Sequence, residues 1–357
     1  MRLKKLITAL LIILVLLLIV AAAATFLSDD ISIQPKENVS IAVTGDVMFA
    51  RNMAGVLSLD SSPFAGVSNV TSNVDLLIVN FENAATNSTN AVKGDVPLRC
   101  SPQYVPLLLA NNNTIATLAN NHVFDYGTDG MRDTVSVLNK TGITAIGAGE
   151  NESDAHAGAT QVIHGRNITV FNYMDSNNFA EYGYDVMPPA NGSSPGYSAY
   201  DTATARQQIS QARGNGSDFI VVSMHFGNEY SRAPNEDQIR ISHELIDDGA
   251  DIVIGAHPHV TQGIEMYKGK PICYSLGNFI FDQANVETHR AYFVQIDLVN
   301  DTGMLTVYPV NINGYLPYFM SPSDGSALLN ELNPQCDQLN ITDEGIGRLM
   351  FNLTTDN

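Results

Sequence analysis

The segment Gly249-Ala-Asp-Ile-Val-Ile-Gly-Ala-His-Pro-His259 decides the fold class. A helical pattern from Gln238 to Asp248 ends at Gly249, and the apolar residues Ile252 to Ile254 predict a short buried strand. The polar sequence Gly-Ala-His-Pro-His follows this strand at once. A short apolar run that follows a helix is typical of a strand covered on both faces. The segment therefore predicts an α/β protein.

The same pattern recurs on both sides of this segment. Further strands are predicted at Val39–Val43, Leu76–Val79, Thr114–Leu118, Ile168–Tyr173, Phe219–Ser223 and Pro271–Ser275, and further helices at Met131–Lys140 and Ala203–Ala212. Two longer alternating runs, Arg290–Val299 and Met304–Asn311, flank Asn-Asp-Thr-Gly and predict a β-hairpin. We expect residues 39–320 to form one α/β domain, residues 28–38 a linker, and residues 321–357 a peripheral polar tail.

Polar side chains of the kinds that bind metals stand just beyond the ends of five predicted strands. In α/β sheets the ligand crevice lies outside the carboxyl ends of the strands, so we expect these side chains to converge. A single polar residue after a strand has simpler explanations, such as a turn aspartate at position 46 or a helix cap at Asn120-Asn121. Packing alone does not explain why such residues follow five strands. The residues are Asp46, Glu82, Asn121 with His122, His225, and His257 with His259.

The pair His257-Pro258-His259 is the most specific of these signals. Two imidazoles at positions i and i+2 of an extended segment point to the same side, and the proline stiffens the spacing. Gly255 before the pair permits a close approach of the backbone. Histidines with nearby carboxylates suit Zn²⁺, Mn²⁺ or Fe. The pattern therefore predicts a site of one or two divalent ions and hydrolytic chemistry on phosphate esters or related electrophiles; two surface histidines are the alternative.

Charge and cysteine content exclude other classes of function. The 357-residue chain has 18 Lys and Arg against 37 Asp and Glu, a formal net charge of −19, which argues against nucleic acid as a partner. An apolar fraction of 45% argues against disorder. The three cysteines are far apart, so neither a disulfide scaffold nor a cysteine zinc site is expected.

The N-terminus predicts export from the cytoplasm. Arg2, Lys4 and Lys5 precede an almost unbroken apolar run from Leu6 to Ala24. Such a run is just long enough to span a bilayer core of about 30 Å, and the basic residues before it predict that the remainder lies outside. Residues 1–27 are thus either an uncleaved transmembrane signal anchor or a cleaved signal peptide, since an Ala-x-Ala-like end is present as well.

Six segments in this order resemble the CapA family, the capsule-synthesis proteins linked to poly-γ-glutamate, which are similar to the calcineurin-like metallophosphoesterases. The resemblance covers about residues 39–283. Its carriers are Val43-Thr-Gly-Asp-Val-Met48, Val79-Asn-Phe-Glu-Asn83, Ala119-Asn-Asn-His-Val-Phe-Asp-Tyr-Gly127, His225-Phe-Gly-Asn-Glu-Tyr230, Gly249–His259 and Tyr274-Ser-Leu-Gly-Asn-Phe-Ile-Phe281.

This resemblance implies a four-layer α/β/β/α sandwich with the metal site at the strand ends. The first ion would be held by Asp46, Glu82 and His259, and the second by Glu82, Asn121, His225 and His257. The bridging ligand would be Glu82, with His122 near the leaving group as acid or electrophile and Asp46 also counted as catalytic. Arg51, Asn228, Glu229 and Asn278 are candidate substrate contacts.

Two positions depart from the phosphatase pattern. Met48 stands where the phosphatases keep a ligand histidine, and Glu82 stands where they have aspartate. The first ion site therefore lacks one ligand, and we expect one tight ion or a weak second one.

The leading hypothesis is a membrane-anchored, outward-facing CapA-type protein. It would act in the synthesis of capsule or an exopolymer, with the polymer and its synthase or export proteins as partners. The alternatives are a general extracellular phosphoesterase and a non-catalytic scaffold for a polymer synthase or exporter, which the substitution at Met48 motivates.

Overall fold

The computed structural model describes residues 37–94, 96–177, 186–334, 336 and 338–353. The apolar run of residues 6–24, predicted as an anchor or signal peptide, lies outside these residues. Among the helices that are described, none is both long and apolar enough to cross a membrane. The described residues all belong to one structural unit, which begins at Glu37.

The first of two large sheets has ten strands and combines parallel with antiparallel pairing. Its strands are β1 (Val39–Val47), β2 (Leu76–Phe81), β5 (Thr114–Thr117), β6 (Thr144–Ile146), β15 (Asn278–Ile280), β16 (Arg290–Val299), β17 (Thr302–Asn313), β18 (Leu316–Phe319), β19 (Asn340–Ile341) and β20 (Gly347–Asn352). The order is β19-β20-β17-β16-β1-β2-β5-β6, with β15 paired to β1 and β18 to β17. Strands β1, β2, β5 and β6 are parallel, whereas β16, β17 and β20 extend the sheet in antiparallel fashion.

The second sheet has six strands. They are β8 (Ala159–Ile163), β9 (Arg166–Met174), β11 (Phe219–His225), β12 (Ile252–Ala256), β13 (Ile264–Tyr267) and β14 (Lys270–Cys273), in the order β13-β14-β12-β11-β9-β8. The four central strands β14, β12, β11 and β9 are parallel. Their carboxyl ends therefore lie at the same edge of the sheet.

Two short sheets and a set of helices complete the described fold. The short sheets pair β3 (Ala84–Ala85) with β4 (Arg99–Cys100), and β7 (Ala148–Gly149) with β10 (Gly196–Tyr197). The α-helices are α2 (Ser68–Thr71), α3 (Gly127–Thr141), α4 (Glu152–His156), α5 (Thr202–Gly214), α6 (Glu236–Asp247) and α7 (Pro322–Leu332). The 3₁₀ helices are η1 (Arg51–Gly55), η2 (Ala65–Val67), η3 (Pro102–Leu108) and η5 (Val286–His289).

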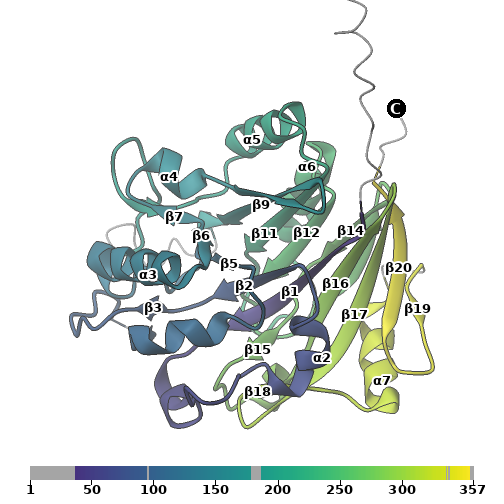
Figure 1. Ribbon diagram of the computed structural model, residues 1–357, viewed down its shortest axis with the longest axis horizontal. Helices are drawn as coiled ribbons and strands as arrows, with labels where there is room; N and C mark the ends of the chain where they lie inside the picture. Colours follow the sequence, from purple (N-terminus) through teal and green to yellow (C-terminus); the bar gives the residue numbers. More distant parts are fainter. Residues whose placement is uncertain (1–36, 95, 178–185, 335, 337, 354–357) are drawn as a thin grey trace, which may run out of the picture. The chain divides into compact units, whose positions relative to one another are not determined.

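Helices cover the outer faces of both sheets (Figure 1). On the six-stranded sheet, Ile209 of α5 and Leu245 of α6 are buried in one apolar cluster with Val222 of β11. On the ten-stranded sheet, Met131 of α3 is buried in another cluster with Leu77 of β2. These clusters explain the periodic apolar positions of the helices, which would otherwise face water.

The two sheets face each other across a third apolar cluster, and β1 shows how its side chains alternate between cores. Ile41 and Val43 lie in the cluster between the sheets, together with Val170 and Val221 of the second sheet. Ala42 lies in the outer cluster, under the helices. A strand buried on both faces is apolar at every position, which is the pattern that predicted it. The mixed α/β fold is confirmed.

Local sequence signals set the ends of the helices. The Asn235 side chain accepts a hydrogen bond from the backbone N–H of Gln238, whose side chain bonds back to the Asn235 backbone, a capping box at the start of α6. Asp201 caps α5 by accepting from the N–H of Thr204. Gly142 ends α3 in the left-handed conformation, at φ 86°.

The structure differs from the sequence analysis at two places in the ten-stranded sheet. β1 does not end at Val43 but runs through Asp46 to Val47, with a shift in register against β2 between Val43 and Asp46. The hairpin predicted around residues 300–303 is present as β16 and β17, with β17 extended at both ends.

The tail beyond residue 320, expected to be peripheral, contributes to the body of the protein. β20 pairs with β17, and Leu349 and Phe351 of β20 are buried in the cluster between the sheets. Leu328 and Leu329 of α7 are buried in the same cluster. In the sequence, polar residues separate these short groups of apolar side chains. The polar composition of residues 321–357 therefore suggested a segment on the surface.

Candidate metal centre

Five of the predicted ligands meet at the carboxyl ends of strands from both sheets. Asp46 lies near the end of β1, Glu82 directly follows β2, and His225 ends β11. His257 and His259 follow β12. All five side chains belong to buried residues, none more than 4% exposed. They form two groups that could each hold a metal ion: Glu82 with His225 and His257, and Asp46 with Glu82 and His259.

Two glycines allow the strand ends to come this close. A Cβ at Gly45, next to Asp46, would lie 1.9 Å from the backbone oxygen of Gly277. A Cβ at Gly255, two residues before His257, would lie 2.0 Å from the backbone oxygen of Tyr274. The close backbone approach predicted for Gly255 is therefore present, and it brings the loop after β14 against the site.

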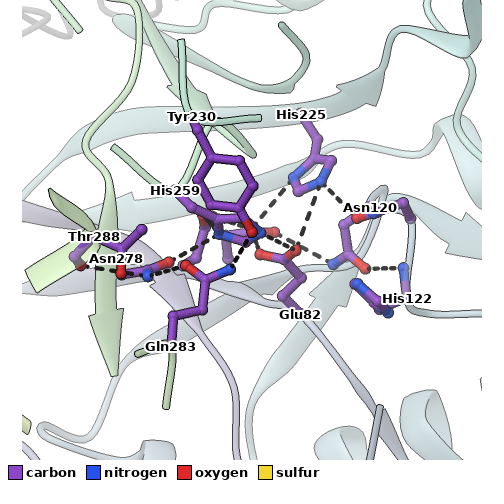
Figure 2. Close-up of polar contacts among 12 residues, drawn as sticks. Glu82, Asn120, His122, His225, Tyr230, His259, Asn278, Gln283 and Thr288 are labelled. Carbon is purple, nitrogen blue, oxygen red and sulfur yellow. Dashed lines mark hydrogen bonds and ion pairs between the residues drawn. The ribbon is translucent and has the colours of Figure 1, made fainter. Parts of the chain in front are cut away.

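Glu82 is the residue that the two groups share. Its Oε1 atom lies 4.0 Å from Nε2 of His225 and 3.9 Å from Nε2 of His259. His259 also approaches Asp46, with 3.2 Å between Nδ1 and Oδ2. Figure 2 shows dashed lines from Glu82 to both imidazoles, one at the end of β11 and the other in the loop after β12. The carboxylate thus occupies the position of a bridge between two candidate ion sites.

Asn80 orients this carboxylate pair, and the sequence analysis did not identify it. Its Nδ2 donates to Oδ1 of Asp46 at 2.8 Å and to Oε2 of Glu82 at 3.4 Å. Asn120 in turn donates to Oδ1 of Asn80 at 3.3 Å and to the backbone oxygen of Phe81 at 3.0 Å. One signal could have found Asn80: it is the polar residue within the apolar strand Leu-Leu-Ile-Val-Asn-Phe.

The donor set fits a divalent cation. Within the described part of the chain, Oδ2 of Asp46 and Oε1 of Glu82 accept no hydrogen bond although both are buried. A buried carboxylate oxygen without a donor is costly, and a bound cation removes that cost. The oxygen and imidazole nitrogen atoms present are ligands for Mn²⁺, Zn²⁺ or Fe.

Burial dominates the electrostatics of the site in the absence of an ion. It raises the pKa of Glu82 well above its usual range, and the neighbouring charge of Asp46 adds to this effect. Burial also lowers the pKa of His225 and of His257 well below the ordinary value, as does the mutual repulsion of the histidines. The two imidazoles are therefore neutral at pH 7 and ready to donate a lone pair.

The histidine pair reaches the site by a different backbone geometry from the one predicted. The segment is not extended: His257 has φ 99° and His259 has φ 58°, both in the left-handed region that side chains other than glycine rarely adopt. The assumption of an extended i, i+2 pair was therefore wrong, although both side chains do join the site. Tyr230 and Arg51 nearby also have positive φ, at 62° and 52°. Backbone strain of this kind is typical of functional sites.

His122 and Asn121 lie on the other side of the site, in the loop after β5. Oδ1 of Asn121 is 2.9 Å from Nε2 of His225, a member of the second ion group. Nδ1 of His122 is 2.7 Å from Oδ2 of Asp125. Burial lowers the pKa of His122, and the charge of Asp125 opposes that shift. Asp125 belongs to the segment that carried the resemblance, but its role as partner of His122 was not predicted.

The predicted substrate contacts separate into two pairs. Arg51 and Glu229 line a cavity of about 520 Å³ together with Asn121, His122 and His259. The side chains of Asn228 and Asn278 lie elsewhere: Asn228 is exposed and accepts from Asn235, whereas Asn278 is 1% exposed beneath His259. A larger cavity of about 880 Å³ adjoins the start of β14 and contains none of the candidate ligands.

Asn278 is buried and contacts a candidate metal ligand. Its Oδ1 lies 2.9 Å from Nδ1 of His259, and its Nδ2 donates to Oε1 of Gln283 at 2.9 Å. Gln283 in turn donates to the hydroxyl of Tyr230 at 3.3 Å, and Figure 2 shows this chain of contacts. Asn278 therefore fixes the orientation of the His259 ring.

Met48 offers no ligand to the site. It is fully buried in the cluster under the helices, and its sulfur accepts a hydrogen bond from the N–H of Ala50 at 2.9 Å. The Met48 side chain therefore packs in the apolar core and does not point to the candidate ion sites. The ion group of Asp46, Glu82 and His259 has one protein ligand fewer than the phosphatase pattern would supply.

Comparison with protein families and sequences gives a consistent result. The family model described as bacterial capsule synthesis protein PGA_cap matches residues 40–283. The PGA biosynthesis protein CapA of Bacillus subtilis (strain 168) is 34% identical over 298 residues, which cover 81% of this chain and 74% of that protein. The capsule biosynthesis protein CapA of Bacillus anthracis is 32% identical over 287 residues, which cover 77% and 68%.

Weak matches to solved structures include one calcineurin-like phosphoesterase and one nucleotidase. The calcineurin-like phosphoesterase YfkN from Bacillus subtilis has a TM-score of 0.43 and 13% identity, and the match covers 89% of this chain and 92% of that one. The NAD nucleotidase of Haemophilus influenzae has a TM-score of 0.45 and 14% identity, covering 81% and 54%.

Proposed function

The chain belongs to the bacterial capsule synthesis protein PGA_cap family, and on that premise we propose that it is a metal-dependent enzyme of capsule or exopolymer synthesis. The reaction class is hydrolysis or transfer at a phosphoryl or carbonyl centre of the polymer or its precursor. The observation that carries the proposal is the position of Glu82 between two groups of buried ligands.

Two sets of residues would hold the ions. Asp46, Glu82 and His259 form the first set, and His225 and His257 with Glu82 form the second, which Asn121 adjoins. A divalent ion bound there would lower the pKa of a water molecule and polarise a phosphoryl or carbonyl oxygen. The shortage of ligands in the first set favours one tightly held ion and a weaker second one.

His122 is the residue that would move a proton. The 2.7 Å contact with Asp125 assigns the hydrogen of the neutral ring to Nδ1, since a carboxylate can only accept. Nε2 is then the nitrogen that can accept or, after protonation, donate a proton to a leaving group. His122 lines the same cavity as His259, so that proton transfer and metal binding would face one substrate.

We further propose that the protein acts at the outer face of the cell membrane. The apolar run of residues 6–24 with basic residues before it supports an anchor, or a cleaved signal that would release the protein. The partners would be the polymer and the membrane proteins that synthesise or export it. The capsule-related names of the relatives support this assignment.

A non-catalytic scaffold is the second candidate, and the packing of Met48 favours it. If the first ion group cannot hold metal, the family member would contribute by binding the synthase or exporter alone. This candidate predicts that alanine at Asp46, Glu82 or His259 leaves polymer production intact.

The test combines metal analysis with polymer production. Elemental analysis and anomalous diffraction of the purified full chain should give one or two transition-metal ions at these ligands. His257→Ala should lose metal and abolish polymer production in a host that lacks its own family member. The matched control is His164→Ala, because His164 lies on the surface and pairs with Asp75. Absence of metal together with unchanged polymer production by His257→Ala would overturn the proposal.

A further inference from the structure

Lys93 is a buried lysine in a loop whose neighbouring residues face water. Val92 is 47% exposed and Gly94 is exposed, whereas Lys93 is 5% exposed. Lysine is almost never buried to this extent without partners, because removing the ammonium group from water is costly. The loop therefore turns this one side chain inward against a strong opposing cost.

Backbone and side-chain contacts hold the ammonium group in place. The N–H of Val92 donates to the backbone oxygen of Asp125 at 2.9 Å, and the N–H of Leu98 donates to Oδ2 of Asp125 at 2.6 Å. Nζ of Lys93 donates to the backbone oxygen of Asn121 at 3.1 Å and lies 3.7 Å from Oδ1 of Asp125. The loop is thus fastened on both sides of Lys93 to the segment that carries His122.

Lys93 and a second cationic residue line the same cavity as two candidate metal ligands, Asn121 and His259. Lys93, His122 and His259 all border the cavity of about 520 Å³. Arg51 borders it too; its guanidinium pairs with Asp282 and stands 5.6 Å from the centre of the Phe281 ring. Two cations are therefore fixed beside the ion sites of a chain whose formal net charge is −19, in a cavity that Glu229 and Asp282 border as well.

We infer that Lys93 selects substrates that carry an anionic group, a phosphoryl or a carboxylate, next to the bond that reacts. This inference rests on the proposed function and specifies its substrate class. A negatively charged surface repels an anionic chain, so a site that accepts one needs positive charge inside the cavity; bound divalent ions would supply part of it, and fixed cationic side chains would add to it beside them. Lys93 supplies that charge as a point donor, and Arg51 supplies it at the cavity wall.

The experiment measures anion binding directly and does not depend on turnover. Full-length protein loaded with Mn²⁺ is titrated calorimetrically with inorganic phosphate, with tri-γ-glutamate, and with the same tripeptide whose carboxylates are amidated. Four proteins are compared with wild type: Lys93→Met, Lys93→Gln, Lys93→Arg, and the control Lys140→Met at an exposed lysine on α3. Metal content and thermal denaturation are recorded for each.

Lys93→Met should weaken binding of the recognised anion by about 10- to 100-fold, the range of a charge-assisted hydrogen bond, with metal content unchanged. Lys93→Arg should stay close to wild type, and the amidated tripeptide should bind weakly to all variants. The probe that loses affinity, phosphate or tri-γ-glutamate, identifies the source of the anion. If Lys93→Met fails to fold, Lys93→Gln decides the question, since its amide still offers an N–H donor but carries no charge.

Equal affinity of wild type and the uncharged variants would overturn the inference, as would equal binding of charged and amidated tripeptide or no binding of either anion by wild type. Equal affinity of wild type and the uncharged variants would mean that Lys93 only holds the loop against Asp125. These outcomes concern Lys93 alone, whereas a wild-type protein that takes up no metal would refute the proposed function.

Discussion

Oδ2 of Asp125 lies 2.7 Å from Nδ1 of His122, and the same oxygen accepts the backbone N–H of Leu98 at 2.6 Å. The carboxylate is fully buried, so its orientation is fixed by these donors. It therefore determines both the tautomer of the imidazole and the direction of the ring.

We predict that neutral His122 carries its hydrogen on Nδ1. Nitrogen-15 chemical shifts of histidine-labelled protein, loaded with Zn²⁺ to avoid paramagnetic broadening, report the tautomer. Asp125→Asn should reduce the Nδ1–H form and lower the pKa of His122 further, because Asp125 is the group that opposes the effect of burial. Asp129→Asn, at an exposed carboxylate of α3, should change neither. A wild-type ring protonated on Nε2 would contradict the assignment.

Asn278→Ala should weaken metal binding without removing a ligand. The change deletes the acceptor at 2.9 Å from Nδ1 of His259 and frees that ring to rotate. Loss of such a partner typically costs about 10- to 100-fold in metal affinity. Competition with a fluorescent chelator measures the affinity, and Asn228→Ala, an exposed residue of the adjoining loop, serves as control. Unaltered affinity in Asn278→Ala would show that His259 is held by other contacts.

Metal affinity should increase as the pH rises from the acidic range to neutral. Burial and the charge of Asp46 raise the pKa of Glu82, so that metal-free protein retains a proton that a divalent ion must displace. His225 and His257 have lowered pKa values and are already neutral, so they contribute little proton release. Calorimetric titration with Mn²⁺ in two buffers of different ionisation enthalpy measures the protons released. Glu82→Gln should abolish this release, and a wild-type affinity that improves on acidification would contradict the prediction.

The sequence predicted the strands and the convergence of ligands for one physical reason. Strands buried on both faces are apolar throughout, and residues that follow parallel strands must meet at one edge. His225 and His257 could therefore be placed near each other, because they stand at the ends of the neighbouring parallel strands β11 and β12. Their approach to Glu82 depends on how the two sheets pack, which the strand pattern does not contain.

Other features depend on tertiary contacts that a local pattern does not contain. Lys93 lies in a polar loop, and nothing in its neighbours indicates that its side chain turns inward. Asn278 looked like a substrate contact because its role depends on the distance to His259, which the fold sets. The left-handed backbone at His257 has no signal in the sequence, because such a conformation normally marks glycine and the residue here is histidine.

Gly255→Ala should destabilise the protein by about 1–3 kcal/mol, the usual cost of overpacking a core. The new Cβ would lie 2.0 Å from the backbone oxygen of Tyr274, so one of the two strand ends must shift. Gly214→Ala at the end of α5 is the control: its Cβ would meet nothing within 4 Å, and the change should be neutral or slightly stabilising. Chemical denaturation compares the free energies of unfolding. Equal stability of both variants would show that the strand ends are not packed this tightly.

The final strand provides a test of whether residues beyond 320 belong to the body of the protein. Leu349 and Met350 are neighbours on β20, and their side chains point to opposite faces, being 1% and 61% exposed. Leu349→Ala removes a buried side chain from the cluster between the sheets and should cost about 2–5 kcal/mol of unfolding free energy. Met350→Ala changes an exposed side chain and should stay within about 0.5 kcal/mol of wild type. Equal, small effects of the two changes in chemical denaturation would restore the interpretation of a peripheral tail. A large difference in unfolding free energy between these adjacent positions requires that β20 is a strand of the sheet, paired with β17. In a peripheral segment both side chains would be exposed, and the two substitutions would have similar effects.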